Sequence, residues 1–172
     1  MHPTLAGVIE KYRTLRERVY RSTEQNFANL RIRARPITEA NAAEADVWPD
    51  KHGVRTWSWQ QWLPAFRKDP KRFDLAIYVG ETLCAVCLGQ PSVGKMALKL
   101  YIVQGKPYDN PIEGNILNVV FYAAHSYAKA LGSLEVHICE PANDRLIAIY
   151  AKHGYQASEN KEGVVTQMKK PT

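Results

Sequence analysis

The chain has 172 residues, of which 45% are hydrophobic, and this fits one domain with a buried core. No apolar run approaches the roughly 18 to 20 residues that cross a bilayer, and the N-terminus lacks the charged-then-apolar order of a signal peptide. We therefore expect a cytoplasmic protein without a membrane segment. Three cysteines do not form a disulfide framework. A formal net charge of +6 favours acidic partners such as phosphorylated ligands or nucleic acid, or it reflects an ordinary basic surface.

The N-terminal residues, from Pro3 to about Glu24, are predicted to form one long helix. Pro3 suits a first helical turn, and apolar residues recur every three or four positions. The other faces carry Lys11 and several arginines. Either the helix packs on the domain or on a second subunit and its basic face is solvated, or the basic face binds the phosphates of nucleic acid. We divide the chain into residues 1–26, this amphipathic helix, and residues 27–172, the main domain. The apolar positions are Leu5, Val8, Ile9, Tyr12, Leu15 and Val19.

The next segments predict an edge strand, a short helix and an aromatic stretch. Residues 30–37 alternate apolar side chains with arginines, and Pro36 ends the strand. Thr38 can cap a helix over residues 38–45, and residues 48–53 form a loop. Residues 55–73 are rich in tryptophan, and Pro64 predicts two short turns or a kink there. The aromatic side chains could stack bases, although a core or pocket-wall role is favoured.

Strands then follow one another. Residues 75–79 and 83–88 form a hairpin around the turn Gly80-Glu81, residues 89–94 form a second turn, and residues 96–103 form a third strand. Their nearly continuous apolar character indicates a mixed α/β sheet that is covered on both faces. Cys84 and Cys87 should point to opposite faces because their spacing is odd, so we expect no metal or redox site. After a loop at residues 105–111, residues 112–131 predict a helix.

Residues 127–155 contain the clearest boundaries. Gly132 can take the positive φ that ends a helix, and residues 134–139 alternate as a strand that Pro141 terminates. Asn143 stands where a helix N-cap belongs, and Leu146 and Tyr150 follow at helical spacing. Residues 155–158 and 164–168 can close the fold as a hairpin.

The segment from Asn143 to Tyr155 reads Asn-x-x-x-Ile-Ala-x-Tyr-x-Lys-x-Gly-aromatic. It resembles the coenzyme A (CoA)-contacting segment of the GCN5-related N-acetyltransferases, and the order of elements from about Leu30 to Met168 is similar to that domain. The resemblance implies a mixed, mostly antiparallel sheet with helices on both faces, an extra N-terminal helix and acetyl-CoA as co-substrate. By the same resemblance, Asn143 contacts the pantetheine arm, and Tyr150 protonates the departing CoA thiolate. The backbone of Tyr101, Ile102 and Val103 would bind the pantetheine amides.

The pyrophosphate signature of that family, Gln/Arg-x-x-Gly-x-Gly/Ala, is not present in its usual form. Asn115 and Leu117 stand where the two glycines are expected, and Gly114 is the nearby glycine. Backbone N–H groups at a helix start can still bind phosphate, and Lys106 could add a charge. The candidate pyrophosphate residues are therefore Gly114, Asn115 and Ile116.

The acceptor half of the site is less defined. His137 and Glu140 are the candidate general bases, because either could deprotonate an amine directly or through a water. Trp48, Trp57 and Trp59 are expected to wall the acceptor side. The leading hypothesis is acetyl transfer from acetyl-CoA to an amine by direct attack.

Other functions remain open on the sequence. The alternative is a catalytically degenerate binding module for nucleic acid or a protein partner, and an acetyltransferase acting on charged tRNA combines the two. The apolar stripe of the N-terminal helix also makes a homodimer plausible. No catalytic-triad order, Walker loop or zinc spacing supports nucleophilic, nucleotide-hydrolysing or metal chemistry.

Overall fold

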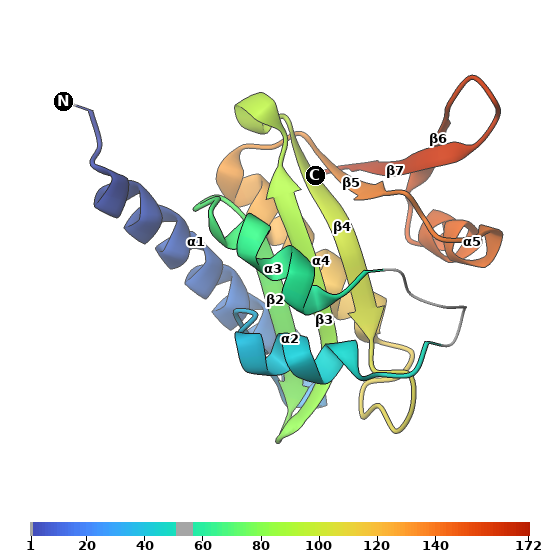
Figure 1. Ribbon diagram of the computed structural model, residues 1–172, viewed down its shortest axis with the longest axis horizontal. Helices are drawn as coiled ribbons and strands as arrows, with labels where there is room; N and C mark the ends of the chain where they lie inside the picture. Colours follow the sequence, from blue (N-terminus) through green and yellow to red (C-terminus); the bar gives the residue numbers. More distant parts are fainter. Residues whose placement is uncertain (1, 51–56) are drawn as a thin grey trace.

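A computed structural model describes residues 2–50 and 57–172. Its centre is a seven-stranded sheet with the order β1-β2-β3-β4-β5-β7-β6, and helices lie on both faces (Figure 1). The elements are α1 (Leu5–Asn26), β1 (Ile32–Arg35), α2 (Glu39–Asp46), α3 (Trp59–Arg67), β2 (Phe73–Val79), β3 (Thr82–Pro91), β4 (Ala97–Gly105), α4 (Ile116–Leu131), β5 (Glu135–Cys139), α5 (Asp144–Lys152), β6 (Gln156–Glu159) and β7 (Val165–Pro171). Two short 3-10 turns, Ala28–Leu30 and Val93–Lys95, join them.

The predicted mixed, mostly antiparallel sheet is confirmed. Only β4 and β5 pair in parallel, with Leu98 opposite Val136, and α4 provides the crossover that a parallel pair requires. The other strand pairs are antiparallel. The turn predicted at residues 89–94 is shorter than expected, because β3 continues to Pro91.

Two cores lie on the two faces of the sheet. The larger core joins the sheet to α1, α4 and α5, and the smaller one joins it to α2 and α3. Neighbouring residues of β2 divide between them, since Ile77 packs in the larger core and Ala76 in the smaller one. This division explains why the central strands read as continuous apolar runs.

Helix α1 packs on the domain along only part of its length. Thr4, rather than Pro3, precedes the first helical residue, and its hydroxyl accepts a hydrogen bond from the Gly7 amide at 3.1 Å. Tyr12 and Val19 are buried in the larger core, whereas Leu5 is 72% exposed. The N-terminal end of the helix therefore extends beyond the sheet (Figure 1). No helix in the described ranges is long and apolar enough to span a membrane.

The prediction of two short turns around Pro64 is wrong, because α3 is one helix from Trp59 to Arg67 with Pro64 inside it. Proline removes the hydrogen bond to the carbonyl group four residues earlier, which belongs to Gln60. Both Pro64 and Gln60 are exposed, so water can solvate that carbonyl group. Ser58 supports the helix start, since its hydroxyl accepts a hydrogen bond from the Gln61 amide at 3.0 Å.

The helix predicted from residue 112 begins four residues later, at Ile116. The side chain of Asn110 holds the intervening residues in a turn. Its amide nitrogen donates to the Cys84 carbonyl at 2.8 Å, and its oxygen accepts from the Ile112 amide at 3.1 Å. Ile112 is buried in the larger core by this turn, so its apolar character reflects core packing rather than a helical face.

The prediction that Cys84 and Cys87 point to opposite faces is also wrong. Ile77 of β2 pairs with Ala85 and Tyr78 pairs with Leu83, so Cys84 is an extra residue in the ladder. Such a bulge shifts the alternation by one position, and both cysteines pack in the larger core. No cluster of His, Cys, Asp and Glu able to hold a metal occurs within the described residues.

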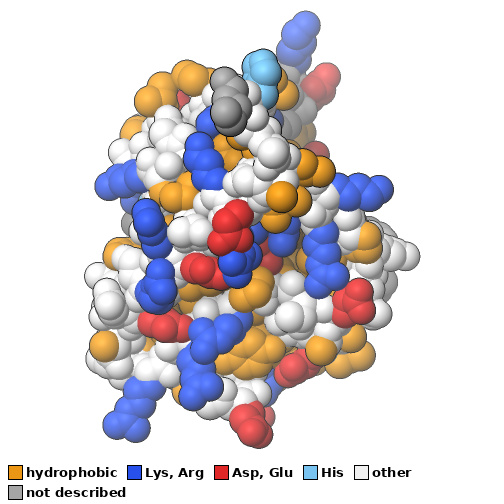
Figure 2. Space-filling model, turned by 90° about the vertical axis from the view of Figure 1, so that its left-hand side faces the viewer, with side chains coloured by type: hydrophobic (Ala, Val, Ile, Leu, Met, Phe, Trp, Pro, Cys, Tyr) orange, Lys and Arg blue, Asp and Glu red, His pale blue; other side chains and the backbone are white. Residues whose placement is uncertain are grey.

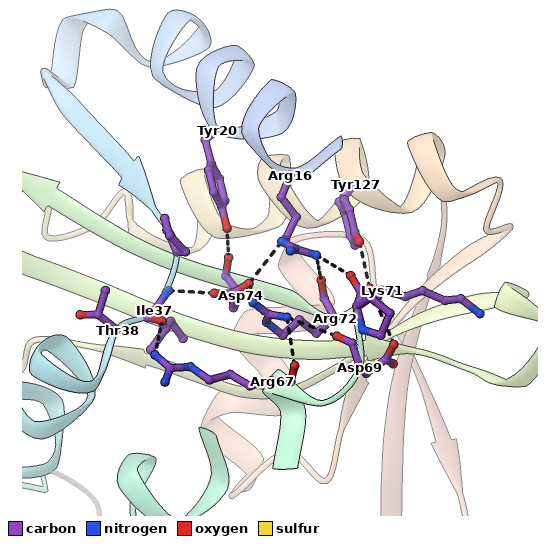
Figure 3. A network of polar contacts seen from close by, with 12 residues as sticks. Arg16, Tyr20, Ile37, Thr38, Arg67, Asp69, Lys71, Arg72, Asp74 and Tyr127 are labelled. Atoms are coloured by element: carbon purple, nitrogen blue, oxygen red, sulfur yellow. Dashed lines mark hydrogen bonds and ion pairs between the residues drawn. The ribbon is translucent and has the colours of Figure 1, made fainter. Parts of the chain in front are cut away.

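A buried polar network connects α1 to the sheet (Figure 3). Asp74 on β2 is 1% exposed, and its carboxylate lies 3.5 Å from Arg16 Nε and 3.4 Å from Arg72 Nε. Its other oxygen accepts a hydrogen bond from the Ile37 amide at 2.8 Å. The Tyr20 hydroxyl donates to the Asp74 carbonyl group. One carboxylate therefore links α1, β2 and the segment before α2.

Candidate functional site

The parallel strands β4 and β5 diverge at the centre of the molecule. They pair from Ala97 opposite Glu135 to Leu100 opposite Ile138, and no pairing continues beyond that point. Glu140 adopts a left-handed conformation with φ 46°, and Pro141 directs the chain away from the sheet. From Ile102 to Gly105, β4 therefore pairs with β3 alone, and Tyr101 is an extra residue at a register shift in that ladder. The other edge of β4 has no partner strand there, so its backbone polar groups are available to a ligand.

A groove occupies this opening. A cavity of about 170 Å³ lies where the strands separate, and a second cavity of about 290 Å³ extends toward the start of α4. Val103, Leu146 and Tyr150 line both cavities, so the two are adjacent, and together they are called the groove. The first cavity is also lined by Trp57, Leu100, Tyr101, Ile102, Ile138, Cys139, Glu140, Pro141 and Ala142. The second is also lined by Pro49, Asp50, Gln104, Gly105, Lys106, Pro107, Glu113, Ile116 and Leu117.

Helix α5 supplies one wall of the groove. Asn143 precedes the helix in an extended conformation, and its side-chain oxygen accepts a hydrogen bond from the Leu146 amide at 2.9 Å. This is the N-cap geometry that the sequence predicts. Leu146 and Tyr150, four residues apart, then lie on the helical face toward the groove. Asn143 does not line either cavity, so its observed role is to begin the helix.

Tyr150 is a buried tyrosine in the wall of the groove. Its side chain is 5% exposed and packs edge-on against Phe121, with ring centroids 5.9 Å apart. Burial raises the pKa of Tyr150 to about 12, so the phenol is protonated at neutral pH. Within the described residues, no side chain or backbone group hydrogen-bonds to its hydroxyl group, which is therefore available to a bound ligand.

The far end of the groove is the start of α4. Gly114 has φ 84°, and Asn115 is the N-cap residue but makes no side-chain capping bond. The first-turn residue Ile116 lines the cavity together with Lys106. Glu113 also lines this end and adds a negative charge there.

The two candidate bases are placed differently. Glu140 is exposed and lines the first cavity. His137 is not among the described residues that line either cavity, and it is 8% exposed on β5. Its Nε2 lies 2.6 Å from the Glu135 carboxylate, and its buried Nδ1 has no hydrogen-bond partner within the described residues. Hydrogen bonding to His137 lowers the pKa of Glu135.

Of the three tryptophans expected at the acceptor side, only Trp57 lines the groove. Trp59 is fully buried in the smaller core, and its indole N–H donates to the Gln104 side chain at 2.6 Å. Trp48 is buried in the same core. An aromatic chain nevertheless reaches the groove, running from Trp57 through Trp62, Phe66 and Tyr101 with ring centroids 5.5 to 6.1 Å apart.

Several groove residues were not predicted from the sequence, and Cys139 and Leu146 are two of them. Cys139 lies beside Tyr101 in the first cavity, and burial raises the pKa of both side chains. Leu146 lies between the two cavities. The position of Cys139 at the last residue of β5, two residues before Pro141, is the signal that could have identified it.

No family model matches this chain, and no curated protein matches it. Solved structures do match. Ard1 from Thermoplasma volcanium has a TM-score of 0.65 at 12% identity, over 83% of this chain and 98% of that one. The GNAT domain of S. lividans PAT has a TM-score of 0.63 at 15% identity, over 82% and 90%. The paia N-acetyltransferase from Thermoplasma acidophilum, in complex with coenzyme A, has a TM-score of 0.56 at 14% identity, over 82% and 99%.

The chain has the fold of the GCN5-related N-acetyltransferases. At 12 to 15% sequence identity, the similarity to these solved structures shows the fold alone. The groove between β4 and β5 is the feature of this GNAT fold that any functional proposal has to explain.

Proposed function

We propose that this chain transfers an acetyl group from acetyl-CoA to the amine of an acceptor. The observation that carries the proposal is the unpaired edge of β4 across the groove from Tyr150. An extended pantetheine arm has amide groups that can pair with this edge as a strand would. The structure of the Thermoplasma acidophilum protein in complex with coenzyme A supports the same use of the fold.

The groove has a suitable residue at each position along such a ligand. The backbone of Tyr101 and Val103 would hold the pantetheine amides. The thioester would lie in the first cavity, and the phosphates would lie near Lys106 and the amides that follow Asn115. Trp57 would contact the acceptor, whose amine enters on the side of Glu140.

The reaction then needs one nucleophile and two proton transfers. The neutral amine attacks the thioester carbonyl carbon, and a C–N bond forms as the C–S bond breaks. Glu140, directly or through a water, takes the proton that the amine nitrogen loses, and Tyr150 gives its phenol proton to the thiolate. The products are the acetylated amine and CoA as a free thiol. His137 stays the second candidate base.

Calorimetric titration with acetyl-CoA tests the binding step. We expect saturable heat at millimolar ligand or below, followed by release of free thiol when a panel of primary amines is added. The absence of any heat at millimolar acetyl-CoA would exclude the proposal. Binding without thiol release for any amine would favour the non-catalytic alternative.

One observation favours that alternative, in which the domain binds nucleic acid or a protein without turnover. Asp50 and Glu113 both line the end of the groove where the phosphates of CoA would lie, and the two signature glycines are replaced. The alternative predicts retention on RNA or DNA that weakens steeply with salt. Thiol release measured with and without tRNA separates it from an acetyltransferase that acts on charged tRNA.

Glu113 provides a charge-specific prediction. Glu113→Gln should tighten acetyl-CoA binding by about threefold to tenfold at low salt, because one negative charge is removed beside the polyphosphate. The measurement is the Kd from calorimetry at two salt concentrations, and the gain should shrink at the higher one. Glu162→Gln, in the exposed turn between β6 and β7, is the matched control and should leave Kd unchanged. Equal effects of the two changes would contradict the assignment of this end of the groove to phosphates.

A further inference from the structure

Another cavity, of about 490 Å³, lies between α1 and β1, and none of its lining residues belongs to the groove. Figure 2 shows this side of the molecule, where Lys and Arg side chains are more numerous than Asp and Glu. Arginines dominate the lining of the cavity itself. They are Arg13, Arg16, Arg21, Arg35 and Arg72.

The floor of the cavity holds two guanidinium groups in fixed positions (Figure 3). Arg16, whose side chain is 7% exposed, donates to the carbonyl groups of Pro70 at 2.7 Å and of Arg72 at 3.2 Å. Arg16 and Arg72 share the single carboxylate of Asp74. The buried Nε of Arg72 has no hydrogen-bond partner among the residues described. The floor therefore carries one more positive charge than negative charge.

The rim adds a further cation. Arg13 pairs with Glu17 at 3.1 Å, and Arg35 pairs with Glu24 at 3.0 Å. Arg21 makes no ion pair with any described residue. Glu10 also contacts Arg13, but it does not line the cavity. Even with Glu10 counted, the arginines exceed the neighbouring carboxylates, so the cavity has a net positive potential.

The walls between these charges are apolar. They consist of the buried ring of Tyr20, the methyl group of Ala34 and the ring of Pro36. Small-molecule sites typically combine such walls with a few charged groups in a volume of about 300–1,000 Å³. Planar guanidinium groups match the oxygens of phosphate in a bidentate manner.

We propose that this cavity binds a small organic anion that carries a phosphate monoester. The phosphate would lie over Arg72 and Arg21, and the organic part would contact Tyr20 and Pro36. This inference is independent of acetyl transfer, because the groove and the cavity are separate.

Phenyl phosphate is a suitable probe, and its binding can be followed by calorimetry or by amide chemical shifts. We expect saturable binding at millimolar concentration, with shifts in α1 and β1. Arg21→Glu should raise the Kd at least about tenfold, because the change reverses a charge at the rim. Arg18→Glu is the matched control, since Arg18 is exposed on the same helix but does not line the cavity. It should change the Kd less than about twofold.

Several results would overturn the proposal. One is no binding of phenyl phosphate at millimolar concentration, and another is chemical-shift changes that are confined to the groove. A third is an equal increase of the Kd in Arg21→Glu and Arg18→Glu. If benzoate binds as tightly as phenyl phosphate, the cavity does not select a phosphate group, and this would overturn the proposal. If inorganic phosphate binds as tightly, the organic part of the ligand contributes nothing to binding, and this would overturn the proposal too. Thermal unfolding of both variants should match the wild type, because both side chains are exposed.

Discussion

Replacing Tyr150 with phenylalanine is expected to lower kcat for acetyl transfer by about 10²- to 10³-fold and to change KM for acetyl-CoA by less than about threefold. In the proposed mechanism, the phenol donates a proton to the leaving thiolate. Its removal affects the transition state more than the bound ground state. The ring stays in place because its packing against Phe121 does not involve the hydroxyl group. Steady-state kinetics by thiol release measures both constants.

Tyr155→Phe is the matched control for this change. Tyr155 is also buried, but its hydroxyl group pairs with His125 Nε2 at 2.9 Å and does not line the groove. Its loss should leave kcat within about twofold of the wild type. Full activity of Tyr150→Phe, or an equal loss in both variants, would show that Tyr150 is not the acid.

The raised pKa of Tyr150 also sets the shape of the pH profile. An acid catalyst is active below its pKa, and burial raises that pKa to about 12. Wild-type kcat should therefore not fall between about pH 8 and about pH 10, where an unperturbed tyrosine would begin to lose its proton. A fall in kcat centred near about pH 10, and absent from the phenylalanine variant, would show that the phenol is not buried during turnover.

Asp74→Asn is expected to lower the free energy of unfolding by about 3–5 kcal/mol, because it leaves two nearly buried guanidinium groups without a counter-charge. Asparagine keeps the shape of the side chain and can still accept the hydrogen bond from the Ile37 amide. The decrease in the free energy of unfolding therefore measures the contribution of the negative charge of Asp74. Urea denaturation followed by circular dichroism gives the value. The midpoint should decrease with an unchanged slope.

Glu10→Gln is the control for Asp74. The ion pair between Glu10 and Arg13 is more than half exposed on both sides, so its loss should cost less than about 1 kcal/mol. A second test replaces Asp74 with leucine and Arg16 with methionine together, which should recover part of the loss because one buried charge is removed with its partner. A loss under about 1 kcal/mol for Asp74→Asn would mean that water reaches the network.

Features that depend on neighbouring residues could be predicted from the sequence. Thr38 and Asn143 begin helices as expected, because a cap depends on residues within one turn. Gly132 ends α4 with φ 77°, and Gly80 closes the hairpin between β2 and β3. Tyr150 reaches the groove because helical spacing fixes which face it shares with Leu146.

Features that depend on distant residues could not be predicted. Ile112 looks like part of a helix, but the Asn110 side chain bonds to Cys84, which is 26 residues away, and holds a turn there. The bulge at Cys84 arises from the register with β2, which alternation within one strand does not contain. Trp59 was expected in the wall of a pocket, but its indole N–H donates to the Gln104 side chain. Only tertiary packing determines this position of Trp59.

The candidate site was predictable to a similar extent. Val103 and Glu140, two of the candidate site residues, line the groove. Cys139 was missed because its exposure to the groove depends on where β4 and β5 stop pairing, which is a property of two strands separated by a helix. His137 was included because it lies on β5, but its side chain faces Glu135 rather than the groove.

The attachment of α1 has a consequence for biosynthesis. Arg16 and Tyr20 find their partners 54 residues later in the chain, and Ser22 pairs with Tyr122, which is 100 residues away. At a translation rate of about 5–20 residues per second, the helix waits for seconds before these partners leave the ribosome. During that time its apolar stripe is uncovered. We therefore expect nascent chains that stop before β2 to be bound by chaperones and those that extend past α4 to be released.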